Sequence, residues 1–153
     1  MNTEALHLFL EDPTNFGENR LPAHSDHFYY ESEKEVSKGE DMALRQSLNG
    51  IWKFKYSVNL FERPKDFYKE DFDISKFDDI KVPGHIETQG YDTIHYTNAM
   101  YPWDGTEKLD PPYISKDFAP VGSYVTDVKI KKELRTVPYL FLSRALKLVS
   151  DSL

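Results

Sequence analysis

Hydrophobic and polar residues alternate most regularly over residues 51–57, directly after the turn signal at residues 48–50 (LNG). Trp52, Phe54 and Tyr56 share one side of this segment, and two lysines occupy the other. A period of two residues is typical of a β-strand with one buried face. We therefore expect an antiparallel strand here, with its aromatic side against a core.

Two further segments have strand character. Residues 79–83 form a short run that ends in a proline, and residues 121–131 alternate over a longer stretch. In the longer run Gly122 and Tyr124 lie on one side, and Val121 and Ser123 lie on the other. The alternation predicts that Tyr124 joins Trp52 and Phe54 in the core.

Helical signals are weaker. Residues 3–10 can form one or two helical turns before Pro13, which cannot continue a helix. Residues 63–77 contain spaced aromatic side chains, and Pro64 suits a first helical turn, so we expect a short surface helix there. The remainder of residues 1–47 is polar and irregular, and its Glu/Lys-rich part up to Asp41 is predicted to be solvated.

Short strands separated by Gly and Pro turns, with no alternation of strands and helices, indicate an all-β sandwich. With 153 residues, the chain has the length of one domain. We divide it into an irregular N-terminal segment (residues 1–47), an all-β domain (48–134) and a divergent tail (135–153).

Charge and composition exclude several classes of partner. A net charge of −7 argues against nucleic-acid binding, which needs clustered Lys and Arg. The absence of cysteine rules out disulfides and Cys-bound metals and fits a reducing cytoplasm. The first residues lack a basic region, so they do not resemble a secretory signal. No apolar run approaches the ~18–20 residues of a membrane span, and we expect a soluble cytoplasmic protein without a membrane partner.

The segment with the clearest chemistry is residues 80–105 (IKVPGHIETQGYDTIHYTNAMYPWDG). Prolines and glycines interrupt it every few residues, so a regular helix is not expected. Aromatic rings stack on the C–H faces of sugars, and Asn, Asp and His side chains hydrogen-bond to hydroxyl groups. This composition favours carbohydrate recognition.

Eight short segments resemble, in order and spacing, the N-terminal region of the β-galactosidases of glycoside hydrolase family 2. They are residues 19–24 (NRLPAH), 47–54 (SLNGIWKF), 82–86 (VPGHI), 89–92 (QGYD), 96–98 (YTN), 101–103 (YPW), 111–112 (PP) and 120–124 (PVGSY). Each is weak alone, but together they extend over residues 19–124. The resemblance implies an incomplete jelly-roll β-sandwich, the sugar-binding domain of that family.

The resemblance also assigns one substrate contact. In the family, an asparagine of the Tyr-Thr-Asn motif reaches the galactose pocket, and the matching residue here is Asn98. The alternative is that Asn98 caps a turn. Trp103 can stack on a sugar, although a tryptophan in a Tyr-Pro-Trp turn is more often a core residue.

Metal binding is not indicated. His85 and His95 have no third ligand at a suitable spacing, and loop histidines without a metal are the favoured interpretation. The acidic residues between Glu70 and Asp79 fit a solvated face, and no DxDxDG calcium loop is present. By resemblance, the intact family uses magnesium and sodium or potassium, with ligands outside the matched region, so no cofactor is expected in this chain.

No catalytic residue is predicted. Retaining glycosidases use two carboxyl groups about 5–5.5 Å apart, and the family's catalytic glutamates belong to a barrel far downstream of the matched region. The expected function is therefore that of an N-terminal fragment of a β-galactosidase, inactive alone. In the intact enzyme the partner is a β-galactoside, and the enzyme is expected to be oligomeric. The alternatives are a stand-alone carbohydrate-binding module and a complementing subunit of a split β-galactosidase.

The tail suggests a change of reading frame. Residues 137–146 read VPYLFLSRAL, where the family continues with a strand resembling V.I.FQGVE. Codons chosen for these residues and Lys147 also encode PVSISFQGVE in another frame. We therefore expect a frameshift near residues 135–137. The alternative is a genuine tail in which Leu142, Leu146 and Val149 form one stripe of a short amphipathic helix.

Overall fold

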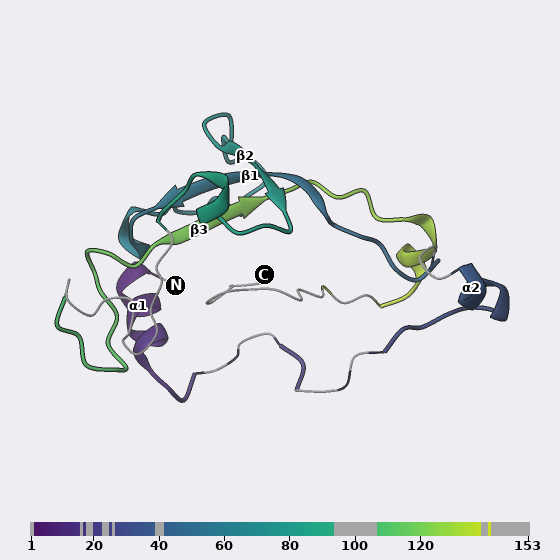
Figure 1. The fold of residues 1–153 in the computed structure, drawn as a ribbon, viewed down its shortest axis with the longest axis horizontal. Coiled ribbons are helices and arrows are strands. Elements are labelled where there is room, and N and C mark those ends of the chain that lie inside the picture. The colour runs from purple at the N-terminus through teal and green to yellow at the C-terminus, as the bar shows by residue number, and fades with distance from the viewer. Residues whose placement is uncertain are drawn as a thin grey trace. The chain divides into compact units, whose positions relative to one another are not determined.

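The computed structural model describes residues 2–15, 17, 20–22, 25, 27–38, 42–93, 107–138 and 141 (Figure 1). The chain divides into two compact units. The first, called here the sheet unit, comprises residues 1–16 and 50–126. The second unit comprises residues 17–49 and 127–153. Each unit is described by itself.

The sheet unit contains a three-stranded antiparallel sheet with the order β2-β1-β3 (Figure 1). The central strand β1 (Gly50–Ser57) pairs with β2 (Asp78–Val82) on one side and with β3 (Val121–Val125) on the other. The strands expected at residues 51–57 and 79–83 are confirmed. The strand expected over residues 121–131 ends at Val125, so its second half was wrongly predicted as a strand.

The core of this unit is built on the aromatic side of β1. Phe54 is completely buried, and Ile80 of β2, which lies opposite Trp52, is 2% exposed. The ring of Tyr124 in β3 lies 4.7 Å from that of Phe54 and 6.5 Å from that of Trp52. The predicted core position of Phe54 is confirmed, while Trp52 and Tyr124 are half-buried.

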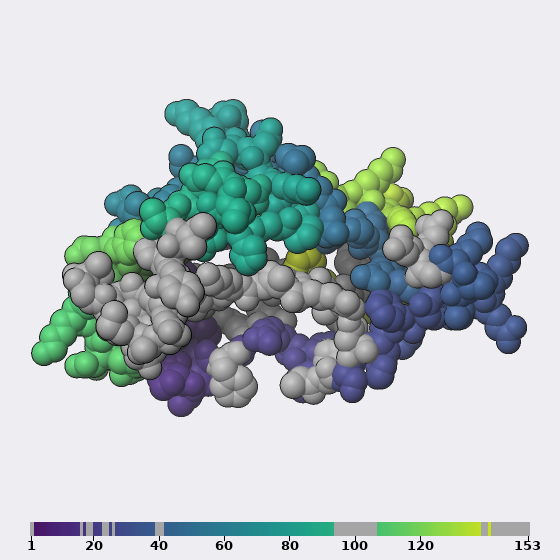
Figure 2. Space-filling model, in the orientation of Figure 1, coloured from purple at the N-terminus to yellow at the C-terminus, as the bar shows by residue number. Residues whose placement is uncertain are grey.

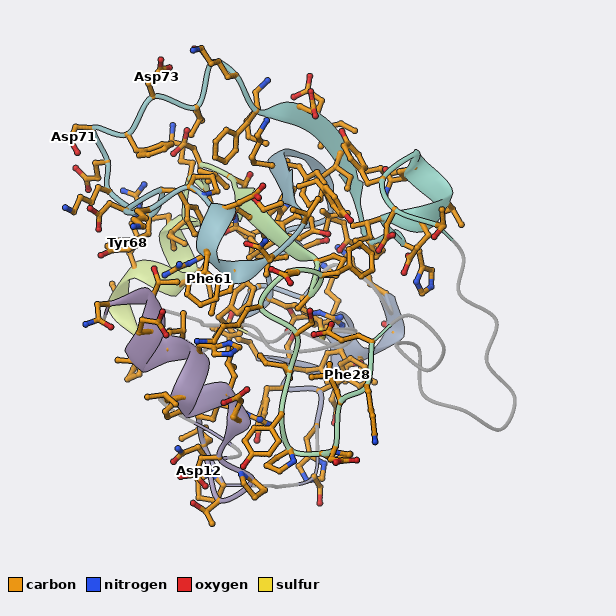
Figure 3. All side chains as sticks on the ribbon, turned by 90° about the vertical axis from the view of Figure 1, so that its left-hand side faces the viewer. Asp12, Phe28, Phe61, Tyr68, Asp71 and Asp73 are labelled. Carbon is orange, nitrogen blue, oxygen red and sulfur yellow. The ribbon has the colours of Figure 1, made fainter. Side chains whose placement is uncertain are left out.

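Helix α1 (Thr3–Glu11) confirms the N-terminal helix. The side chain of Asn2 caps it by accepting a hydrogen bond from the Ala5 amide. On its buried side, the ring of His7 lies 5.5 Å from that of Phe61, in the 3-10 helix η1 (Leu60–Glu62) that follows β1 (Figure 3). The contact fixes α1 beside the end of the central strand.

The surface helix predicted for residues 63–77 is wrong. The segment forms successive turns in which Lys69 and Phe72 donate to carbonyls three residues earlier. Asp66 has a φ of 59°, a left-handed conformation that interrupts a right-handed helix. Asp73 accepts the Ser75 amide with its side chain and so competes with backbone pairing.

The second unit contains a short helix that was not predicted, α2 (Glu33–Lys38). Glu35 lies in the stretch expected to be solvated, yet it is only 9% exposed, and its carboxylate accepts the amides of Glu31 and Ala43. Farther along, the side-chain amide of Gln46 accepts from the Lys131 amide and donates to the Lys129 carbonyl. The 3-10 helix η3 (Lys132–Thr136) follows and buries Leu134.

Candidate functional site

The residues predicted to contact sugar, Asn98 and Trp103, lie outside the described residues, and so does His95. The structure does describe the approach to them, from β2 through residues 83–93. This stretch, called here the approach turn, lies at the molecular surface (Figure 2). It contains the short 3-10 helix η2 (Glu87–Gln89). Its hydrogen bonds and ring contacts join it to the end of β2 and to the core.

Gln89 fixes the approach turn to the last residues of β2. Its side-chain oxygen accepts from the Lys81 amide at 2.8 Å, and its nitrogen donates to the Lys81 carbonyl at 3.0 Å. The same nitrogen lies 3.4 Å from the His85 carbonyl. A single side chain thus pairs with Lys81 as a neighbouring strand would.

Glycine is required where this side chain crosses the turn. A Cβ atom on Gly84 would lie 2.5 Å from the Gln89 nitrogen and 2.8 Å from the Lys81 carbonyl oxygen. Gly90 ends η2 with a φ of 92°, in the left-handed region that glycine adopts readily. The carbonyl of Ile86 accepts the amides of both Gln89 and Tyr91, so the turn closes on itself.

Tyr91 joins the end of the approach turn to the core. Its ring lies 4.7 Å from that of Phe54, edge to face, and 6.4 Å from that of Tyr56, nearly parallel. Burial raises the pKa of Tyr91, and a hydrogen bond with the side chain of Asp78 raises it further. Tyr91 is therefore protonated at neutral pH and holds the chain against the aromatic side of β1.

The neighbouring tyrosines share this environment. Burial raises the pKa of Tyr56, with a second contribution from the negative charge of Asp92. Burial also raises the pKa of Tyr124, with a second contribution from Glu87. Phenols that keep their protons are neutral hydrogen-bond donors. At neutral pH these three phenols can therefore donate hydrogen bonds but are not ionised.

The remaining predicted polar residues lie at the surface. His85 is exposed in the approach turn, as expected for a loop histidine. Asp71 and Asp73 are exposed (Figure 3), and Asp79 forms an ion pair of 2.7 Å with Lys53, so the prediction of a solvated acidic face is confirmed. Within the described ranges, no three His, Cys, Asp or Glu side chains come together to hold a metal ion.

Comparison with known proteins identifies the family. The profile of the sugar-binding domain of glycosyl hydrolases family 2 matches residues 45–137. The chain belongs to glycosyl hydrolase family 2. The antiparallel sheet agrees with the all-β sugar-binding domain expected from the sequence.

Several β-galactosidases are similar to this family 2 chain. That of Clostridium acetobutylicum is 52% identical over 127 residues, which cover 83% of this chain. That of Halalkalibacterium halodurans is 50% identical over 143 residues, or 94% of this chain. A β-galactosidase large subunit of Leuconostoc lactis is 50% identical over 105 residues, or 69% of this chain. The matched region spans 14% of the length of the first two relatives and 16% of the third.

Sequence reasoning missed the supporting residues of the approach turn. Gln89 and Tyr91 entered only as parts of the QGYD segment, and neither had an expected role. The sequence did contain a signal for Gln89: the side-chain amide of a glutamine in a Gly- and Pro-rich turn after a strand can both donate to and accept from the backbone of that strand.

Among the described residues, no helix is long and apolar enough to cross a membrane.

Proposed function

We propose that this chain is the sugar-binding region of a β-galactosidase, an enzyme that hydrolyses terminal non-reducing β-D-galactose residues. The identity of 50–52% to two β-galactosidases over 83–94% of the chain carries the proposal. Since the resemblance puts the catalytic glutamates outside the matched region, we expect the chain alone to be inactive. Its contribution is to complete the substrate pocket of the larger enzyme.

Within that pocket, we assign the galactose contact to Asn98. The amide of an asparagine offers two donors and an acceptor, which suits adjacent sugar hydroxyls. The approach turn supports the assignment, because Tyr91 ties the chain to the buried core seven residues before Asn98. Trp103 is the second candidate, as a ring that stacks on the sugar.

A hybrid enzyme tests the proposal. Residues 45–137 of this chain would replace their counterpart in the H. halodurans β-galactosidase, and hydrolysis of a chromogenic β-galactoside would be measured. We expect an active hybrid. Loss of a sugar hydrogen bond of about 1–3 kcal/mol predicts that Asn98→Ala lowers kcat/KM by about 5–150-fold. A folded hybrid without activity, or an Asn98→Ala variant as active as its parent, would reject the assignment.

A second candidate is a complementing subunit of a split β-galactosidase. Its support is the name β-galactosidase large subunit, which several similar proteins carry. Three of them come from Leuconostoc lactis, Latilactobacillus sakei and Lactobacillus helveticus. A stand-alone carbohydrate-binding module is the third alternative. Activity restored by mixing this chain with a β-galactosidase lacking the matched region would support the subunit, whereas galactose binding by the chain alone would support the module.

Several properties of the larger protein are part of the same proposal. We expect a jelly-roll sandwich completed by further strands, an oligomeric enzyme in the cytoplasm, and no nucleic-acid or membrane partner. We expect magnesium and sodium or potassium to bind outside this chain. The absence of cysteine supports a reducing compartment, and cell fractionation of the tagged protein tests it.

We also propose that the tail after residues 135–137 arises from a frameshift. The family match ends at residue 137. The alignment with the H. halodurans enzyme covers 94% of this chain. Sequencing the gene decides the question: β-galactosidase sequence in another frame downstream of codon 135 is expected, and its absence would reject the frameshift.

A further inference from the structure

We propose that Asn49 and Gly50 form a site of spontaneous covalent modification, at which the side-chain amide of Asn49 is lost as ammonia and the start of β1 is unpaired. No sugar contact takes part in this reaction, so it goes beyond the function proposed above. Both residues are exposed, and Gly50 is the first residue of β1. Asparagine is among the chemically labile residues of proteins, and the surroundings of Asn49 leave it open to reaction.

The reacting groups are the backbone nitrogen of Gly50 and the side-chain carbonyl carbon of Asn49, which are neighbours in the chain. When the nitrogen loses its proton to hydroxide, it attacks that carbon and forms a new N–C bond. The bond from the carbon to the side-chain nitrogen breaks, and this nitrogen takes a proton from water and leaves as ammonia. Water then opens the resulting succinimide at either carbonyl, which gives aspartate or isoaspartate at position 49. Each conversion consumes a water molecule and releases an ammonia molecule.

Neither reacting group is shielded by a side chain of the described residues. The backbone amide of Asn49 donates to the Ser47 hydroxyl at 3.2 Å, but the side chain of Asn49 forms no hydrogen bond with them. Gly50 carries no side chain that would hinder attack, and the position of a Cβ atom there has nothing within 4 Å. The side chain of Asn49 can therefore turn toward the Gly50 nitrogen without losing a hydrogen bond.

Pairing of Gly50 with Val82 controls access to the nitrogen. Lys81 turns its amide and carbonyl toward Gln89, away from β1. Because these directions alternate along a strand, Val82 turns its own toward Gly50, its register partner. The Gly50 amide is thus bonded while this pair is closed. The pair is the last in the ladder of β1 and β2, and the end of a ladder opens more readily than its middle.

Modification alters the entry into β1. Isoaspartate carries the chain through its side chain, so it lengthens the backbone directly before Gly50. The register of a strand depends on the turn that leads into it, and the longer backbone displaces Gly50 from Val82. In the isoaspartate form the Val82 amide should therefore lose about tenfold of its protection against hydrogen exchange. The Ile80 amide, which pairs with Trp52 farther along the ladder, should keep its protection.

The test follows position 49 in the full chain over time. The chain is incubated at neutral and at mildly alkaline pH, with and without urea, and digested; mass spectrometry and enzymatic methylation then identify aspartate and isoaspartate. Protection of the Ile80 amide shows that the sample without urea is folded. We expect conversion in the folded chain that is faster at alkaline pH, because the Gly50 nitrogen must lose its proton. Urea should accelerate it about tenfold if the end pair is open in about one tenth of the folded molecules.

Three controls accompany the test. Asn49→Gln keeps an exposed amide but should abolish the conversion, because its longer side chain closes the ring far more slowly. Asn15 is also exposed, but its side chain donates to Asp12 and a bulky phenylalanine follows it in the sequence. The side chain of Asn59 is buried and held by bonds to three backbone groups. Neither Asn15 nor Asn59 should convert in the folded chain while position 49 does.

Conversion of position 49 in urea but not in the folded chain overturns the proposal, because the closed pair would then protect the site completely. Conversion of Asn15 as fast as position 49 also overturns it, since the glycine and the free side chain would then have no effect. Equal protection of the Val82 amide in the isoaspartate and unmodified forms overturns the predicted unpairing of β1. None of these results depends on whether the larger protein hydrolyses galactosides.

Discussion

Phe54 is the residue at which the contacts of the sheet unit meet. Its ring lies 4.7 Å from each of Tyr91 and Tyr124, so it joins β1, β3 and the approach turn. None of its surface is exposed. A buried aromatic ring of this kind contributes through both the area it removes from water and the close packing around it.

Replacing Phe54 with alanine should therefore cost about 3–5 kcal/mol of the free energy of unfolding, because a buried ring leaves a cavity. Urea unfolding monitored by tryptophan fluorescence measures this cost. Ile51→Ala is the control on the other side of the same strand, where the side chain is 64% exposed, and a change within about 0.5 kcal/mol is expected. Equal effects of the two substitutions would contradict the assigned core.

Glu35 predicts a dependence on pH. The amides of Ala43 and Glu31 hold its pKa below the ordinary value of 4.5. A lowered pKa in the folded state means that the carboxylate stabilises fully above about pH 4.5, and that this stabilisation is lost as pH falls through the lowered pKa. The protection of the Ala43 amide against hydrogen exchange should decrease over the same range.

Glu35→Gln is the corresponding variant. It keeps an acceptor but removes the charge, so its Ala43 protection should be lower than the parent's near neutral pH and similar to it at the acidic end. Protection that does not change with pH in the parent would show that the carboxylate is not responsible. Asp12 serves as a comparison, because a lowered pKa there arises from Thr14 alone and involves no amide of the second unit.

At the scale of elements, one side chain and two glycines together determine the shape of the approach turn. Gly84→Ala places a methyl group where Gln89 crosses the turn, with the Lys81 carbonyl 2.8 Å away. Overpacking of this kind typically costs about 1–3 kcal/mol. We expect loss of protection at the Lys81 amide, measured by hydrogen exchange.

The matched control is Gly17→Ala. A Cβ atom there would lie 3.5 Å from the Arg20 side chain, an ordinary contact distance. The substitution should leave the protection of Lys81 unchanged. Similar exchange in both glycine variants would indicate that the close approach at Gly84 relaxes without consequence.

Strands were predictable from the sequence where hydrophobic residues recur at every second position without interruption. Trp52, Phe54 and Tyr56 alternate without interruption, and β1 was found within one residue of its start. Over residues 63–77 the aromatic spacing and Pro64 predict a helix, which the structure does not contain. The backbone bonds of Asp66 and the side-chain bond of Asp73 decided the outcome locally, and such competition is not visible in a hydrophobic pattern.

At the scale of the whole molecule, large apolar side chains remain at the surface. Leu8 and Ile51 are each 64% exposed, and Tyr113 and Phe118 are 59% and 51% exposed. We expect the 153-residue chain to bind the dye ANS and to express poorly, because exposed apolar surface favours association. Dye fluorescence and thermal unfolding test this together. Dye fluorescence no greater than that of a well-folded control protein would contradict it.

The candidate site was predicted only in part at this scale. The motifs predict a sugar-contacting segment around Asn98, which lies outside the described residues. The hydrogen bonds between Gln89 and Lys81, eight residues apart, depend instead on the path of the backbone between them. The burial of Glu35 also depends on the path of the backbone, and so does the pairing of Gln46 with Lys129 and Lys131. Contacts made by polar side chains to distant backbone groups leave no periodic trace in a sequence.

The bonds of Gln89 also limit how the sheet can grow. A strand added beside β2 would need the amide and carbonyl of Lys81, and both already bond to a side chain of the same chain. Backbone groups at the outer edge of a sheet are what an incoming strand pairs with. A strand that joined β2 at this position, from the same polypeptide or another, would therefore have to displace the Gln89 side chain.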